Sequence, residues 1–142
     1  MTNTSARKKR SRGTAIVEAS FIFLVFLLML IGVFDFGQFL FVHQALVERA
    51  RGAARWGAIN DPTDTNSIQN KVLYDQPTAP TSGSSYFGLT TSMVQVSTSG
   101  SGTDNYRLTV LITNYPYQML SPYITGTYSG PNVLVSIPLG LD

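Results

Sequence analysis

The sequence predicts an α+β protein in which one long N-terminal helix packs by its second half on a small antiparallel β-sheet. Residues 14–42 are mostly apolar and hold seven of the eight phenylalanines. All seven prolines and all seven tyrosines of the 142-residue chain lie in 60–142. That second region is rich in serine and threonine, and it contains short stretches that alternate apolar and polar residues, as strands do.

The composition excludes several classes of function. The chain has no cysteine and a single histidine, which argues against a disulfide scaffold, a thiol catalyst and a multi-histidine metal site. We therefore expect no enzymatic activity, no catalytic residue, no cofactor and no metal. Half of the ten basic residues lie in residues 1–13, which contain no acid. These basic residues are Arg7, Lys8, Lys9, Arg10 and Arg12. The basic character thus belongs to a short leader, and we expect no nucleic-acid partner.

Residues 14–42 are expected to form a transmembrane helix. Residues 19–34 carry no charge, but they span only about 24 Å of helix, against a hydrocarbon core of about 30 Å. A span that begins at Thr14 reaches about 31 Å and includes Glu18 near one end. The basic leader, residues 1–13, places the N-terminus in the cytoplasm and residues 60–142 on the far side of the membrane.

A buried core helix and a cleaved secretory signal both fit the apolar segment less well. A buried core helix would need more chain around it, because the polar remainder is too small to wrap so bulky a helix on every side. A cleaved secretory signal would need a small-x-small pattern after the apolar run, and bulky residues follow it instead.

The helix is expected to continue outside the membrane over residues 43–59. Proline is absent until the stop signal Asn60-Asp61-Pro62, so one helix over about 14–59 would be roughly 70 Å long. Its glycines are the positions where it would break: Gly32, Gly37, Gly52 and Gly57. At 100° per residue, one face carries a packing seam that tapers from large to small side chains, so that a sheet can approach closely. The seam consists of Phe39, Val42, Leu46, Ala50, Ala53 and Gly57.

Residues 60–142 are expected to form an extracytoplasmic β domain rich in serine, threonine and proline. It opens with a short helix over 66–74, capped by Asp64 or Thr65, and a loop over 76–92 follows. The apolar alternation then predicts strands over 93–98, 106–113 and 132–137, with a hairpin between the first two. The seam on the long helix would cover the apolar face of this sheet.

A few conspicuous residues have plain structural interpretations. Residues 61–66 (DPTDTN) superficially resemble a calcium loop but lack its glycine and its terminal glutamate, so helix-stop and capping chemistry is favoured. His43 is interpreted as an interfacial polar residue and Trp56 as a packing residue at the helix–domain junction. Three tyrosines among prolines either pack within loops or form a partner surface: Tyr115, Tyr117 and Tyr123.

The most informative motif lies where the helix enters the membrane. Gly13 ends the basic run, and Glu18 follows five residues later among apolar residues. A carboxylate at membrane depth costs about 2–3 kcal/mol or more, so it usually has a partner. A cut after Gly13 would create an α-amino group on Thr14, one helical turn from Glu18. Without a cut, Arg12 or an interfacial position would satisfy Glu18.

These features resemble a type IV prepilin-type signal and, more specifically, the TadE-like proteins of tight-adherence (Flp-type) pilus systems. The matching pieces are RG followed by A-x-V-E at 12–18, G-x-x-D-F-G at 32–37 and ALVERARGAARWGA at 45–58. A looser similarity continues over 107–122. Two positions depart from the pattern. Ala19 stands where Flp-type pilins often have tyrosine, and Leu24 stands about where TadE-like helices often carry proline, which suggests a straighter helix.

The resemblance implies a minor pseudopilin of pilin-like architecture, a single-pass subunit of the cytoplasmic (inner) membrane that acts in pilus assembly. A prepilin peptidase would cut between Gly13 and Thr14, and Glu18 would be the carboxylate required for packing or processing. The implied partners are the prepilin peptidase, other pilins and pseudopilins, the inner-membrane assembly platform and the lipid bilayer.

Two alternatives remain at this point, and the start of the mature protein separates them. A membrane-tethered binding or sensor module with an uncleaved anchor would start near Met1. A secreted domain would start beyond residue 36. The pseudopilin would start at Thr14.

Overall fold

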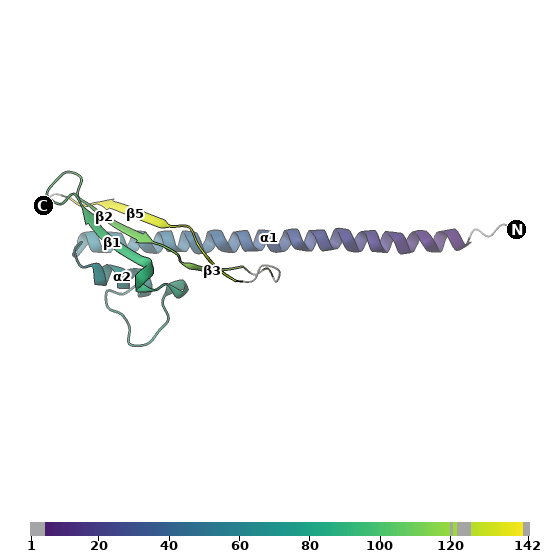
Figure 1. Cartoon of the computed structure of the whole chain (residues 1–142), viewed down its shortest axis with the longest axis horizontal. Helices are drawn as coiled ribbons and strands as arrows, with labels where there is room; N and C mark the ends of the chain where they lie inside the picture. The colour runs from purple at the N-terminus through teal and green to yellow at the C-terminus, as the bar shows by residue number, and fades with distance from the viewer. Residues whose placement is uncertain (1–4, 120, 122–125, 141–142) are drawn as a thin grey trace.

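In the computed structural model, which describes residues 5–119, 121 and 126–140, one helix runs along most of the molecule and carries the other elements on its C-terminal half (Figure 1). This arrangement confirms the predicted α+β fold, with a pilin-like layout of a long helix and a small antiparallel sheet. The helices are α1 (Ser5–Ile59) and α2 (Thr65–Tyr74), with short 3-10 turns η1 (Tyr86–Gly88) and η2 (Thr91–Met93). The strands are β1 (Val94–Ser99), β2 (Arg107–Ile112), β3 (Pro116–Gln118), β4 (Thr127–Ser129) and β5 (Val133–Pro138).

Helix α1 is one continuous helix, as predicted, and it does not break at any of the four glycines that could have interrupted it. It begins at Ser5, nine residues before the predicted start at Thr14. The leader allows this extension because Ala, Arg and Lys are good helix formers and no proline interrupts them. Helix α1 ends at Ile59, where Asn60 donates from both its backbone and its side-chain nitrogen to the Trp56 carbonyl at 3.0 and 2.9 Å.

The acidic residues after α1 shape the turn into α2. The Asp61 carboxylate accepts hydrogen bonds from the backbone nitrogen and the hydroxyl of Thr63, at 2.8 and 2.6 Å. The Asp64 carboxylate accepts from the Ser67 backbone nitrogen at 3.1 Å and so caps α2. These hydrogen bonds lower the pKa of both carboxyl groups. Both acids therefore perform the turn and capping chemistry that the sequence favoured.

Strands β1, β2 and β5 form an antiparallel sheet in the order β1-β2-β5. The register pairs Val96 with Val110 and Val110 with Val135, so the predicted apolar alternation falls on one face. Leu108 and Ile112 on the central strand are fully buried on that face. Each end of these three strands lies one residue from its predicted position.

The short β3–β4 pair was not predicted. It forms a separate two-stranded antiparallel sheet in which Tyr117 pairs with Tyr128. Each strand is only three residues long, and β3 begins at a proline, which interrupts the alternation that signals a strand. The sequence favours a proline-containing loop over residues 114–118 for this reason.

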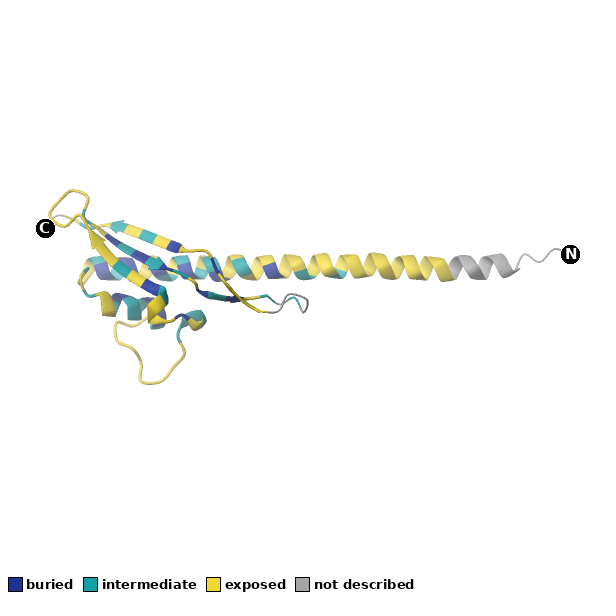
Figure 2. Ribbon diagram, viewed as in Figure 1, coloured by how far each residue is buried: buried dark blue, intermediate teal, exposed yellow. Residues whose placement is uncertain are grey.

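The second half of α1 forms one wall of the hydrophobic core, together with α2 and the buried face of the β1-β2-β5 sheet (Figure 2). Val42, Leu46, Ala50, Ala53 and Gly57 are buried on this side, and Phe39 is half-buried against the same core. Ala54 is also buried there and was not part of the predicted seam. A Cβ on Gly57 would lie 2.6 Å from Ile68 Cδ1 and 3.0 Å from Leu108 Cδ2, so glycine permits the closest approach of the layers.

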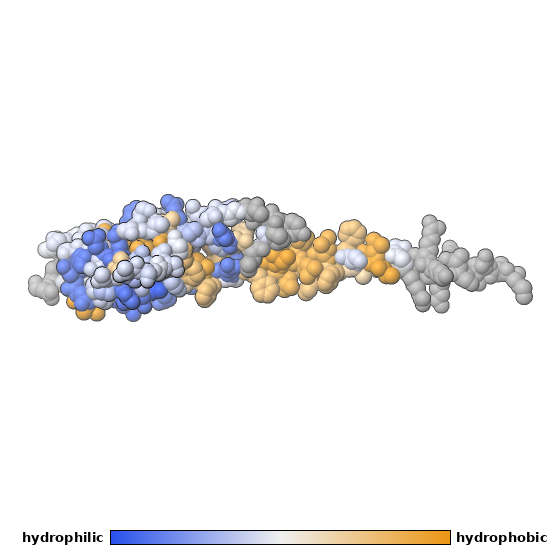
Figure 3. Space-filling view, turned by 90° about the horizontal axis from the view of Figure 1, so that it is seen from below, coloured by the Kyte–Doolittle hydropathy of each residue, from blue (hydrophilic) through white to orange (hydrophobic). Residues whose placement is uncertain are grey.

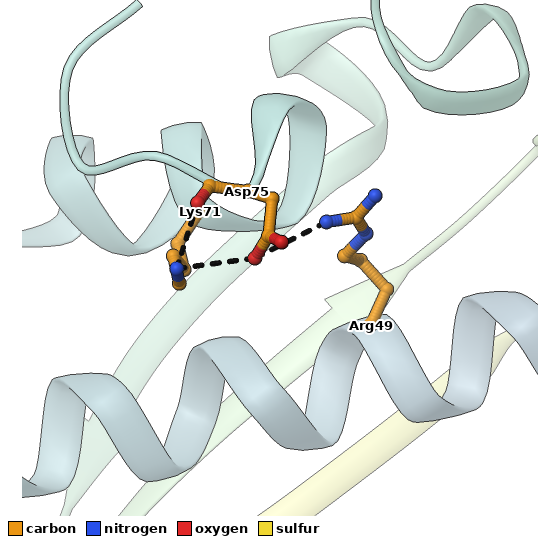
Figure 4. A network of polar contacts seen from close by, with 3 residues as sticks. All are labelled: Arg49, Lys71 and Asp75. Atoms are coloured by element: carbon orange, nitrogen blue, oxygen red, sulfur yellow. Dashed lines mark hydrogen bonds and ion pairs between the residues drawn. The ribbon is translucent and has the colours of Figure 1, made fainter.

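A small charged network ties α2 back to α1 (Figure 4). The Asp75 carboxylate lies 3.2 Å from a guanidinium nitrogen of Arg49 and 3.1 Å from Lys71 Nζ. Arg49 also lies over the ring of Tyr86, with 4.2 Å from its guanidinium carbon to the ring centroid. The hydrogen bond from Lys71, followed by the charge of Arg49, holds the pKa of Asp75 below its ordinary value.

We expect Asp75→Asn to reduce the acid sensitivity of the fold. Because the folded pKa of Asp75 lies below its unfolded value of about 4, its contribution is present above that pH and is lost as pH falls through the folded pKa. The side chain is largely exposed, so the loss at pH 7 should be only roughly 0.2–1 kcal/mol. Denaturant unfolding between pH 3 and pH 7 measures this, with exposed Asp104→Asn as the control. Identical pH profiles for wild type and Asp75→Asn would contradict the role given to the network.

Candidate assembly site on the long helix

The first half of α1 is an apolar rod without any covering element. Large apolar side chains are exposed on all sides of it between Ile16 and Phe34, whereas such exposure is rare in a water-facing helix. We call the elements from α2 to β5 the outer domain. The space-filling view shows the apolar surface of the rod as a band beside this polar domain (Figure 3). Helix α1 is long and apolar enough to cross a membrane once, judged by length and composition.

The residues of the predicted processing motif lie at the N-terminal end of this rod. Gly13, Thr14 and Glu18 are all exposed, and a Cβ on Gly13 would meet nothing within 4 Å. Thr14 and Glu18 lie one helical turn apart, so their side chains share a face of α1. The basic residues Arg7–Arg12 belong to the first turns of α1, and their side chains lie outside the described part of the chain. The Gly13–Thr14 peptide bond is thus in helical conformation on an open surface.

A second constellation lies where the rod meets the outer domain. Asp35 is the only charged residue between Glu18 and Glu48, and it is only 8% exposed. Beside it, the Tyr117 hydroxyl donates to the Asp35 backbone carbonyl at 3.2 Å. The Tyr117 ring also meets Phe39 edge to face, with 5.3 Å between centroids. This cluster joins β3 to α1 at the domain end of the rod.

The neighbouring tyrosine extends this contact toward the domain core. Tyr115 is fully buried, and its hydroxyl lies 3.2 Å from His43 Nδ1. Burial is the main cause that raises the pKa of Tyr115 and of Tyr117 above the ordinary value, so both hydroxyls stay protonated. Both tyrosines therefore pack inside the chain, but against α1 and not within a loop. Tyr123 lies outside the described residues.

Sequence reasoning missed the importance of Asp35. A signal was present, because an acid between two long uncharged stretches is expensive unless it is partnered. Among the described residues, no group of three or more histidine, aspartate or glutamate side chains is arranged to hold a metal ion. His43 is used in the contact with Tyr115, and Trp56 is half-buried against the core at the helix–domain junction.

The fold and these two constellations define a protein with one candidate membrane helix and a small α+β head in a pilin-like layout. A comparison with protein families gives a more particular finding for the N-terminal part of the chain. The family described as TadE-like protein matches residues 13–55, which run from Gly13 through the rod and most of the seam. This match confirms the TadE-like resemblance over that segment, which is less than half of the chain.

The match ends before the outer domain begins, and the looser similarity over 107–122 lies outside it. Searches of curated proteins and of solved structures returned no match to this chain.

Proposed function

We propose that this protein is a minor pseudopilin, a single-pass membrane subunit that acts in assembly of a tight-adherence (Flp-type) pilus. The observation that carries the proposal is that the TadE-like match covers the one segment of α1 that combines an open processing motif with an uncovered apolar rod. A rod exposed on every side is suited to exchange lipid for similar helices, because lateral association in membranes depends on side-chain packing.

In this proposal the rod lies in the cytoplasmic (inner) membrane with its N-terminus in the cytoplasm and its head outside. A prepilin peptidase removes the basic leader between Gly13 and Thr14, which leaves a positive amine at the end of the helix. That amine meets Glu18 of the same or a neighbouring subunit, and the pairing sets the register between helices. Other pilins, pseudopilins and the inner-membrane assembly platform are the expected partners.

The processing step has a direct test. Intact-mass measurement of the protein from its native membrane should give a chain that starts at Thr14. A chain that starts near Met1 would support the membrane-tethered module with an uncleaved anchor. A chain that starts beyond residue 36 would support the secreted domain and would overturn the pseudopilin proposal.

We expect Glu18→Ala to leave membrane insertion intact and to remove most surface pili. Alanine favours insertion, because it removes a carboxylate that costs about 2–3 kcal/mol at membrane depth, but it also removes the group proposed to set the register. The measurements are membrane fractionation and pilus quantification on whole cells. Glu48→Ala is the matched control, because Glu48 is an exposed acid on the same helix that pairs with Arg51 outside the rod. Wild-type pilus levels in Glu18→Ala would count against the proposed role of the carboxylate.

A further inference from the structure

The apolar surface of α1 does not end at the same height on all sides. On the side that carries Asp35 and Phe39, the β3–β4 pair covers the helix. Around the rest of the helix, three large apolar residues continue the exposed surface of the rod, the first at the margin of the strand pair, where it lines a hollow with Tyr128, and the other two farther from it. Phe36, Leu40 and Phe41 are 62%, 42% and 66% exposed, and we call them the apolar collar.

The collar has a sharp upper limit. From residue 44 to residue 55 the exposed residues of α1 are Gln44, Glu48, Arg51, Gly52 and Arg55, and none of them has a large apolar side chain. Below the collar, the uncovered side of α1 is free of charge down to Ala19. The uncovered side is therefore apolar from Ala19 to Phe41, about 35 Å of helix, while the covered side is apolar only from Ala19 to Phe34, about 24 Å.

Neither length matches a hydrocarbon core of about 30 Å, but their mean does. A boundary that is low on one side of a rod and high on the other fits a flat membrane when the rod is tilted. We propose that α1 sits tilted in the bilayer, with the apolar collar inserted among the lipid chains and headgroups of the extracytoplasmic leaflet. This inference rests on the membrane-spanning role of α1 and not on pilus assembly.

The outer domain contributes to the same surface. Phe87 in η1 lies edge to face against Phe41, with 6.5 Å between ring centroids, and it also contacts Tyr86 at 4.5 Å. The Phe87 backbone has φ 49, a left-handed conformation that is unfavourable for a bulky residue. The turn therefore holds this aromatic side chain beside the collar, where apolar groups of the head and of the helix face the membrane together.

Lipid is the occupant that fits the collar, because of the collar's continuity with the rod and its depth along the helix. The collar joins without interruption to the side of the rod that faces lipid. The β3–β4 pair on the other side has edge strands, whose unpaired backbone groups cannot enter hydrocarbon. Tyr128 in this strand pair lies near Asp35. When α1 leans toward its uncovered side, the collar moves down into the membrane and the strand pair moves up toward water. Glu18 can then lie at the inner interface, since the span is completed at its outer end.

The chain contains no cysteine, so single labelled cysteines report the depth of each position. We would place a spin label at Phe41, Tyr128, Gln44 and Leu24 of the full chain in phosphatidylethanolamine–phosphatidylglycerol nanodiscs, and compare its accessibility to oxygen and to a nickel chelate. Leu24, in the middle of the rod, and Gln44, one turn above the collar, are the membrane and water references.

The ratio of oxygen accessibility to nickel accessibility should be at least tenfold higher for the label at Phe41→Cys than for the label at Gln44→Cys. The label at Phe41→Cys should also lie at least as deep in the bilayer as the label at Tyr128→Cys. Free access of nickel to position 41, or a position 128 clearly deeper than 41, would overturn the tilt. Exclusion of both reagents at 41 would show that protein, from this chain or from a partner, covers the position, and it would equally overturn lipid contact. Access of nickel to position 24 would instead show that α1 does not span the bilayer. Leu40→Cys repeats the test with a smaller side chain removed.

Discussion

Replacing Gly130 with alanine is expected to destabilise the outer domain by about 3 kcal/mol or more, at the upper end of the range for overpacked cores. A Cβ at this position would lie 1.9 Å from Tyr115 Cζ and 2.2 Å from Cε2, far inside contact distance. The tyrosine ring cannot move aside easily, because it is fully buried and its hydroxyl lies within hydrogen-bond distance of His43. The backbone is also fixed, since Gly130 donates to the Tyr115 carbonyl at 2.9 Å.

Denaturant unfolding of the full chain in detergent measures this effect, and Trp56 provides the signal. It is the only tryptophan and is packed against the core at the helix–domain junction. Gly140→Ala is the matched control, because a Cβ there would meet nothing within 4 Å, and its effect should be within about 0.5 kcal/mol. A Gly130→Ala protein as stable as Gly140→Ala would contradict the packing of the Tyr115 ring against Gly130, which lies between β4 and β5.

A double-mutant cycle sharpens the attribution to Tyr115. Tyr115→Ala alone should cost roughly 3–5 kcal/mol, as large aromatic truncations in cores do. The double variant Gly130→Ala/Tyr115→Ala should cost less than the sum of the two, because the alanine methyl group then occupies space that the ring has left. Additive losses would show that Gly130 matters for a reason other than the ring.

The long helix and the main sheet could be predicted because each depends on a repeating local signal. The apolar run and the absence of proline until Pro62 predict α1. The apolar alternation predicts the strands at residues 94–99, 107–112 and 133–138. The seam was visible for the same reason, since a helix fixes which side chains share a face. These features need no knowledge of distant contacts.

The contact between β3 and α1 could not be predicted in this way. Tyr117 meets the backbone of Asp35 across 82 residues of sequence, and Tyr115 meets His43 across 72 residues. Such pairs carry no periodic pattern, and Pro116 between the two tyrosines favours a loop interpretation. The burial of Asp35 follows from the same docking, so only its isolation in an apolar segment signalled a role.

The processing end of α1 shows the opposite situation. Gly13 and Glu18 were singled out from spacing alone, and the structure adds that both lie on an open helical surface. The chemistry proposed for them concerns a peptidase and neighbouring helices, so the fold of one chain supplies their accessibility and little more. Evidence for their roles must therefore come from the mature N-terminus and from pilus counts.

Leu46→Ala is expected to remove about 2–5 kcal/mol from the stability of the outer domain, the usual cost of truncating a fully buried leucine. Leu46 is 0% exposed and belongs to the core that α1 shares with α2 and the sheet. Leu134→Ala is a chemically identical control on β5, where the side chain is 64% exposed, and it should change stability by about 0.5 kcal/mol or less. The same Trp56 fluorescence titration measures both variants.

The pair of leucine variants also decides what the head depends on. A three-stranded sheet with one apolar face needs a helix to cover it. Here the second half of α1 is part of that cover, and the first half of the same helix is the rod. If Leu46→Ala unfolds the head at low denaturant while the helical signal from the rod persists in circular dichroism, the head is not an independent domain. Any force on the rod during assembly would then reach the head through a shared core. Equal stability of the two leucine variants would instead show a head that folds without α1.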